Sequence, residues 1–213
     1  MLFEYSEMCQ TYYKSENRNK IILDLCGGTG SWSKPYREAG YDVHVVTLPD
    51  YSVLDIKAFE NTLYLIPTNG DCQRVKRIRI KNIYGILAAP PCTMFSLARC
   101  DKTAKKPRDL RQGMKVVNAC LNIIHECLYY DCRKTGLKFW ALENPATGYL
   151  KRFLGKPALV FNPYEFGDNY SKLTALWGCF NEPKRIAFKH EKTKGLNFTN
   201  QIEHFKHLKT IPK

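Results

Sequence analysis

A cysteine that directly follows a predicted buried strand is the residue best suited to chemistry in this sequence. Cys92 comes after the apolar run 84–89 and two prolines, Pro90 and Pro91, which cannot continue a strand inside a sheet. The chain must therefore turn out at the carboxyl edge of the sheet, where open α/β sheets bind ligands. Most cysteines are inert small hydrophobic residues. Because a basic segment that includes Arg99 follows and favours a thiolate, we predict that Cys92 is a nucleophile.

An acid and a glycine loop are predicted to reach the same edge. Glu143 follows the apolar run 138–142, where a carboxyl would be partly desolvated, as a proton donor requires. The structural alternative is a carboxylate that caps a turn or pairs with a nearby lysine. The predicted strand 20–25 runs into the segment 26–30, Cys-Gly-Gly-Thr-Gly, whose backbone N–H groups could approach a cofactor closely. This segment is neither a P-loop nor the dinucleotide pattern, and a tight turn without ligand is its alternative.

The elements that must position these groups alternate between extended and helical patterns. This order predicts an α/β fold with a doubly wound, mostly parallel sheet. Strands are predicted at 20–25, 42–47, 84–89, 138–142, 158–162 and 174–180, and helices at 33–39, 113–130 and, more weakly, 1–13. The segments 62–66 and 74–80 predict a hairpin with Asn69-Gly70 as its two-residue turn. Its second arm is strongly basic, which suits either phosphate binding or protection of an edge strand.

Composition restricts the partner and the compartment. The net charge is +13, from 33 Lys and Arg against 20 Asp and Glu, which favours a nucleic acid over a membrane. We expect no membrane span and no signal peptide, hence a protein of the bacterial or infected-host cytoplasm. Nine scattered cysteines without a CxxC pair argue against disulfides, and we expect no metal site. The 213 residues predict one domain, with an N-terminal helical segment at 1–19 and a basic C-terminal tail at 179–213.

The motifs together resemble a known family. The ordered set formed by the segments 24–30 (DLCGGTG), 90–96 (PPCTMFS) and 143–145 (ENP) is similar to the cytosine-5 DNA methyltransferases, in particular to the short methylases of phages and prophages. The segment 166–178 also resembles these proteins, so the likeness covers about residues 20 to 180. It implies S-adenosylmethionine as methyl donor and a cytosine flipped out of double-stranded DNA. Cys92 would add to C6 of this base, and Glu143 would act on N3.

The resemblance also implies a set of binding residues. Cys26 stands where the family has an aromatic residue against the adenine, and Trp32 could supply that contact instead. Thr47 stands where an acid is expected to hold the ribose, with Asp50 as a substitute. The implied cofactor-binding residues are Asp24, Cys26, Gly27, Gly28, Thr29, Gly30, Trp32, Thr47, Asp55 and Pro90; the implied substrate-binding residues are Pro91, Ser96, Arg99, Asn144, Lys172 and Thr174.

Restriction-type members of this family have a large target-recognition domain, and we expect none here, because only residues 179–213 follow the last predicted strand. We therefore expect weak sequence specificity, or specificity borrowed from a protein partner or a second copy of the chain. Three alternatives share the same residues. They are methylation of RNA cytosines, nucleic-acid binding by a relative with weak catalysis, and transfer of a modified alkyl group.

Overall fold

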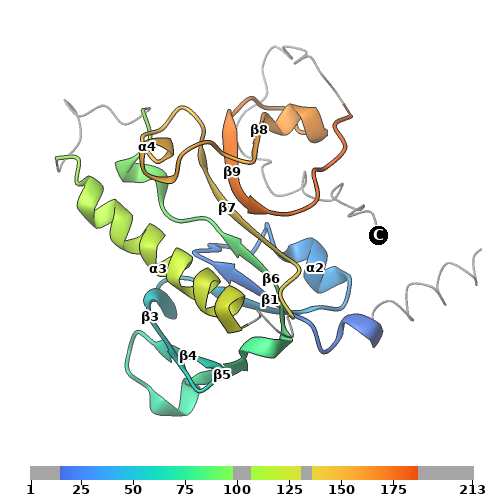
Figure 1. Cartoon of the computed structure of the whole chain (residues 1–213), viewed down its shortest axis with the longest axis vertical. Helices are drawn as coiled ribbons and strands as arrows, with labels where there is room; N and C mark the ends of the chain where they lie inside the picture. The colour runs from blue at the N-terminus through green and yellow to red at the C-terminus, as the bar shows by residue number, and fades with distance from the viewer. Residues whose placement is uncertain (1–14, 98–106, 131–135, 187–213) are drawn as a thin grey trace, which may run out of the picture.

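A six-stranded, mostly parallel sheet forms the centre of the structure, a computed structural model that describes residues 15–97, 107–130 and 136–186 (Figure 1). The strand order is β2-β1-β6-β7-β9-β8, and β9 runs antiparallel to both of its neighbours. The mixed α/β fold with a mostly parallel sheet is thereby confirmed. The strands are β1 (Ile21–Leu25), β2 (Asp42–Val46), β6 (Ile83–Ala88), β7 (Phe139–Pro145), β8 (Leu159–Phe161) and β9 (Thr174–Cys179).

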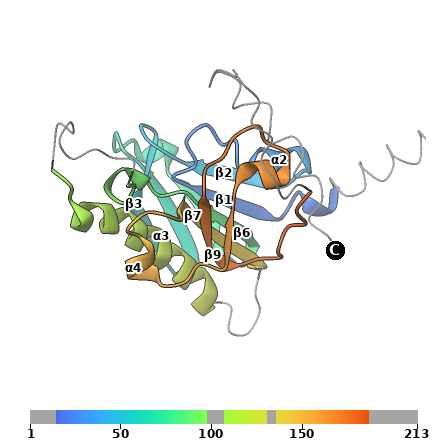
Figure 2. The same cartoon turned by 90° about the horizontal axis from the view of Figure 1, so that it is seen from above.

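Both faces of this sheet are covered. Leu23 and Leu25 of β1 belong to the main core cluster with residues of helix α3, whereas Ile22 belongs to a second cluster against which Tyr36 of helix α2 packs. Helices α2 (Lys34–Glu38) and α3 (Leu110–Tyr130) accordingly lie on opposite sides of the sheet (Figure 2). Because every β1 side chain meets one helix layer or the other, the strand is almost continuously apolar and fully buried.

Helix α3 begins three residues before its predicted start. Asp109 Oδ1 accepts a hydrogen bond from the Gln112 backbone N–H at 2.9 Å, which caps the first turn. The buried face of the helix is formed by Val117, Cys120, Ile123, Ile124 and Cys127. Two of the nine cysteines are thus ordinary core residues. Leu128, in the last turn of the helix, is 41% exposed.

A separate antiparallel sheet lies between β2 and β6 in the chain. It consists of β3 (Tyr51–Phe59), β4 (Thr62–Pro67) and β5 (Lys76–Arg79), in that order. The hairpin pairing of β4 with β5 is confirmed, but the predicted turn is wrong. Asn69-Gly70 lies within an eight-residue connection that contains the 3-10 helix η1 (Cys72–Arg74). The two-residue turn is Glu60-Asn61 instead, between β3 and β4, where both residues have positive φ angles, 44° and 64°.

The remaining elements are short. They are the α-helix α4 (Lys151–Leu154) and the 3-10 helices η2 (Ile80–Asn82), η3 (Cys92–Met94) and η4 (Pro163–Phe166). Of the predicted N-terminal helical segment 1–19, residues 15–17 are helical. The predicted helix 1–13 lies entirely outside the described residues, as does most of the basic tail. Within the described ranges, no helix is both long and apolar enough to cross a membrane.

Candidate functional site

The candidate site lies where the direction of the chain across the sheet reverses. From β1 the chain crosses to β2 on one side, and it later returns to β6 on the other side of β1. Ligands of open α/β sheets bind at such a switch point, outside the carboxyl ends of the strands. The loops after β1 and β6 are directly joined there, because the Ala89 backbone N–H donates to Leu25 O at 2.9 Å.

The glycine loop after β1 is built over a buried carboxyl group. Asp24 is fully buried, and its Oδ2 accepts a hydrogen bond from Ser33 Oγ at 2.5 Å. A Cβ atom at Gly27 would lie 2.4 Å from Asp24 Cγ, so the backbone can pass over the carboxyl only as glycine. Gly28 follows with a φ of +56°, and the loop then presents Gly28 and Thr29 to solvent. Asp24 therefore positions the loop from below, and its predicted contact with a cofactor stays a prediction.

Burial dominates the electrostatics of Asp24. The pKa of this carboxyl is raised above its ordinary value, 3.8, because burial penalises the charged form, while the Ser33 hydrogen bond and the charge of Arg37 oppose the shift. The folded protein therefore holds this proton more tightly than the unfolded chain does. The stability that the protonated Asp24 carboxyl contributes is complete below pH 3.8, the ordinary pKa of the group. This stability is lost as the pH rises through the raised pKa of the folded protein.

Asp24→Asn is therefore expected to change the pH dependence of stability. An asparagine can still accept from Ser33 but carries no charge, so the free energy of unfolding of the variant should improve relative to wild type as the pH rises from about 4 towards neutrality. Urea unfolding of both proteins across this range measures the difference. Asp55→Asn removes an exposed carboxyl and serves as the control for net charge. A difference that stays constant or declines with pH would contradict the raised pKa.

The cysteine at the start of the loop contacts the helix beneath it. Cys26 is half-buried with a φ of +59°, and it packs against the core cluster that includes the buried Cys120 of α3. This contact lowers the pKa of Cys26 and, together with burial, raises that of Cys120. The Cys26 side chain therefore packs against the core and fixes the loop to α3.

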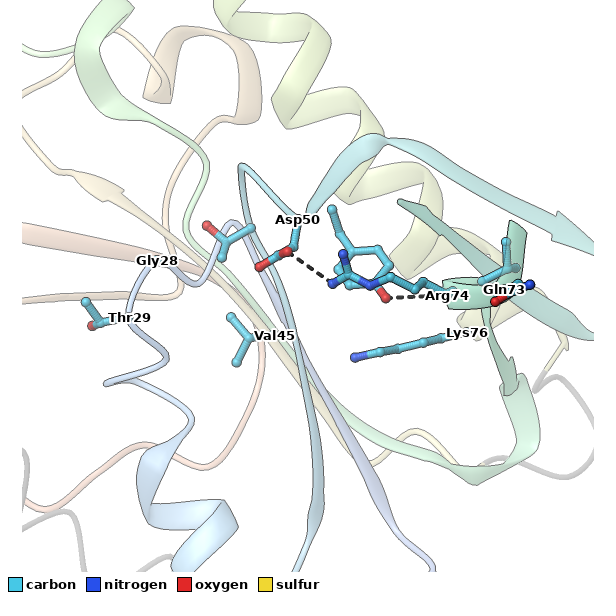
Figure 3. A pocket seen from close by; sticks show the side chains of 10 residues that line it. Gly28, Thr29, Val45, Asp50, Gln73, Arg74 and Lys76 are labelled. Atoms are coloured by element: carbon cyan, nitrogen blue, oxygen red, sulfur yellow. Dashed lines mark hydrogen bonds and ion pairs between the residues drawn. The ribbon is translucent and has the colours of Figure 1, made fainter. Parts of the chain in front are cut away.

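A hollow of about 560 Å³ opens beside the glycine loop (Figure 3). Across from Gly28 and Thr29, the Asp50 carboxylate pairs with Arg74 Nη2 at 3.2 Å. The Tyr51 hydroxyl donates to Arg74 O at 2.9 Å, and Lys76 Nζ lies 5.0 Å from the centre of the Tyr51 ring. The lining residues are Gly28, Thr29, Val45, Thr47, Asp50, Tyr51, Gln73, Arg74, Val75 and Lys76.

The structure brings together part of the predicted cofactor set. Gly28, Thr29, Thr47 and the substitute acid Asp50 line the hollow, whereas Trp32 packs against the core cluster on the α2 face. Asp55 is exposed on β3, and Pro90 is buried before the Cys92 turn; neither of them lines the hollow. The wall formed by Gln73 to Lys76 was not predicted as part of the cofactor site, although phosphate binding was one of the two roles considered for the arm 74–80. Its basic side chains were visible in the sequence, but its position opposite the glycine loop depends on the packing of the β3–β5 sheet.

The turn that carries Cys92 is held by backbone and side-chain contacts. Cys92 is half-buried at the start of η3, and its carbonyl accepts from the backbone N–H groups of Phe95 and Ser96, both at 2.8 Å. Arg108 Nη1 donates to the carbonyls of Met94 and Ser96, at 2.8 and 3.1 Å. Arg108 is thus a positioning residue for the turn, and Phe95 anchors it in the core. Arg99, which was predicted to bind substrate, lies outside the described residues.

Glu143 and Asn144 lie within β7, not after it. The predicted strand end at residue 142 was wrong, because β9 pairs with β7 as far as Pro145. Glu143 is half-buried, and its Oε1 lies 3.4 Å from Lys172 Nζ, so the lysine pairing considered as an alternative is present. Thr174 is buried, and its hydroxyl donates to Lys172 O at 2.8 Å. Lys172 therefore lies beside the acid, whereas Thr174 is paired with Pro145, two residues further along β7.

Asn144 connects this strand to the Cys92 turn. The side chain is fully buried, and its Nδ2 donates to Pro90 O at 3.0 Å. Asn144 is therefore a positioning residue that ties the strand of the acid to the loop of the thiol. Pro91, which follows Pro90 in the chain and was predicted to bind substrate, is exposed.

Asn144→Ala is expected to lower the free energy of unfolding by about 1–3 kcal/mol, because the Pro90 carbonyl loses its partner in a buried place. Chemical unfolding measures the change. The matched control is Asn118→Ala on the exposed face of α3, which should stay within about 0.5 kcal/mol of wild type. Equal stability of the two variants would show that the Asn144 hydrogen bond contributes nothing.

Comparison with known proteins leaves the chain without an assigned family. No protein-family model matches the sequence, and a search of curated proteins finds no significant match.

Proposed function

We propose that this chain transfers a methyl group from S-adenosylmethionine to C5 of cytosine in DNA, as the short phage-type methylases do. One observation carries the proposal. The three strands that bear the glycine loop, Cys92 and Glu143 are neighbours in the sheet, in the order β1-β6-β7. Two hydrogen bonds, from Ala89 to Leu25 and from Asn144 to Pro90, tie their carboxyl ends together.

The hollow suits the nucleoside end of the cofactor. A volume of about 560 Å³ is in the usual range for small-molecule sites. The Thr47 hydroxyl and the Asp50 carboxylate would accept hydrogen bonds from ribose hydroxyls, and the cofactor can approach the backbone at Gly28 closely because this residue has no side chain. Trp32 and Asp55 receive no contact in this arrangement, since they do not line the hollow. When bound, S-adenosylmethionine supplies an electrophilic methyl group.

The protein's own residues activate the base. The Cys92 thiolate adds to C6 of a flipped cytosine, which forms the S–C6 bond and moves the electron pair of the C5–C6 double bond to C5. Glu143 hydrogen-bonds to N3 or protonates it, which offsets the charge that appears on the ring. C5 is then nucleophilic enough to be methylated. A base removes the C5 proton afterwards, the C5–C6 double bond re-forms, and the S–C6 bond breaks.

The net charge of +13 supports a polyanionic substrate, and the family resemblance favours double-stranded DNA over RNA. The test is incubation of the full chain with methyl-labelled S-adenosylmethionine and either duplex DNA or RNA, followed by mass analysis of the nucleosides. Labelled 5-methylcytosine from DNA is the expected product. Label in RNA alone would show that the substrate is RNA and not DNA. The absence of any labelled base, under conditions where cofactor and DNA both bind, would refute the proposal.

A further inference from the structure

The outer face of the β3–β5 sheet carries aromatic and basic side chains in register. One cross-strand row is formed by Lys57, Tyr64 and Arg77, and the next by Phe59, Thr62 and Arg79. We call these six residues the basic-aromatic face. Three of the six are cations, two are aromatic, and none is acidic.

This face points away from the core. Leu63 and Leu65 of β4 and Ile78 of β5 are buried in the main cluster, and side chains alternate between the two faces of a strand. Thr62, Tyr64 and their cross-strand partners therefore occupy the opposite face. Phe59 is 63% exposed there, and the three cations are also exposed.

Protection of an edge explains only part of this pattern. Arg77 and Arg79 lie on β5, an edge strand, where exposed charges discourage pairing with another chain. An exposed phenylalanine does not serve that purpose, and neither does a tyrosine on the central strand β4. Aromatic side chains between cations on an open sheet are instead suited to stack bases and hold phosphates.

We propose that the basic-aromatic face binds a single-stranded segment of nucleic acid. Bases stack on Phe59 and Tyr64, while Lys57, Arg77 and Arg79 contact the backbone. The two rows lie about 7 Å apart along the strands, and neighbouring strands are about 4.8 Å apart, so each aromatic side chain has a cation within reach of a flanking phosphate. A duplex hides the faces of its bases and gains only the contacts to cations.

One acid borders the face at its far end: Asp55 is exposed on β3, two residues before Lys57 and four before Phe59. The other acids nearby do not interrupt the two rows. Glu60 lies in the turn beyond Phe59, and Asp50 is paired with Arg74 at the hollow. The face is also separate from the chemistry at Cys92. Helix α3 packs against both β3 and η3, which places the two features on the same body without sharing residues. The inference therefore goes beyond the proposed methyl transfer and does not depend on it.

Fluorescence anisotropy of the full chain with a labelled single-stranded DNA, and with the duplex of the same sequence, tests the inference. Phe59→Ala should weaken single-strand binding about 5- to 150-fold, the range that corresponds to the loss of one stacked base, and should leave the salt dependence unchanged. Arg77→Gln with Arg79→Gln should weaken binding and reduce the slope of log affinity against log salt by about 1.4. The duplex should respond to the arginine pair but not to Phe59→Ala.

The matched control is Arg18→Gln with Lys138→Gln, which also removes two exposed positive charges. Arg18 lies shortly before β1 in the chain, and Lys138 lies directly before β7. This variant should retain most of the single-strand affinity. Circular dichroism checks that each variant is folded. Wild-type affinity in Phe59→Ala, or an equal loss for the duplex, would overturn the inference. A change in oligomeric state on sedimentation of Phe59→Ala would also overturn it, because the face would then contact a second copy.

Discussion

Cys92→Ser is expected to abolish methyl transfer, with a fall of about a thousand-fold or more, equivalent to about 4 kcal/mol in the activation free energy. A serine hydroxyl is a far weaker nucleophile than a thiolate at neutral pH, so the S–C6 bond has no replacement. The substitution changes one atom in a half-buried turn whose hydrogen bonds are made by backbone groups and by Arg108. Folding and DNA binding should therefore be retained while labelled 5-methylcytosine disappears.

Two controls distinguish a nucleophile from a structural thiol. Cys72→Ser and Cys179→Ser alter exposed cysteines and should leave the rate unchanged. DNA with fluorine at C5 of cytosine has no C5 proton to lose, so the adduct should remain on wild-type protein as a complex stable to denaturation. Cys92→Ser should give no such complex. A full rate in Cys92→Ser would refute the covalent mechanism.

The sequence predicted the central sheet well because its strands are buried on both faces. The runs that became β1, β6 and β7 are short, apolar and followed by glycine or proline, which leaves few alternative structures. The strand β3 was missed for the opposite reason. Tyr51 and Val53 are buried near its start, but the residues after them are mostly exposed and polar, so neither strict alternation nor an apolar run marks it.

The sequence predicted which types of residue form the candidate site better than it predicted which of them contact one another. That Cys92 lies near Pro90, and Glu143 near Asn144, follows from their neighbouring positions in the sequence. That Asn144 donates to Pro90, 54 positions away, depends on the register between β6 and β7. Trp32 illustrates the converse. A tryptophan near a glycine loop suggested a stacking contact, but the direction of its side chain is set by packing with the second cluster, which the sequence does not encode locally.

The glycine loop gives the second large expected effect. Gly27→Ala should lower the free energy of unfolding by about 1–3 kcal/mol, the usual cost of overpacking, and should weaken binding of S-adenosylmethionine. The new methyl group would lie 2.4 Å from Asp24 Cγ and 2.5 Å from both carboxylate oxygens. Asp24 cannot move aside freely, because it is fully buried and hydrogen-bonded to Ser33. Urea unfolding and calorimetric titration with the cofactor measure the two effects.

The clash itself can be isolated with a second substitution. Asp24→Ala removes the carboxyl, so it is destabilising alone but leaves space that the methyl group of Gly27→Ala can fill. The double variant should therefore lose less stability than the sum of the two single variants. Gly28→Ala provides the matched comparison, because its Cβ meets nothing within 4 Å and its cost, about 1 kcal/mol, comes only from the φ of +56°. The cost of Gly28→Ala should be the same in the Asp24→Ala background as in wild type. If the effects of Gly27→Ala and Asp24→Ala were simply additive, the loop would avoid the carboxyl in some other way.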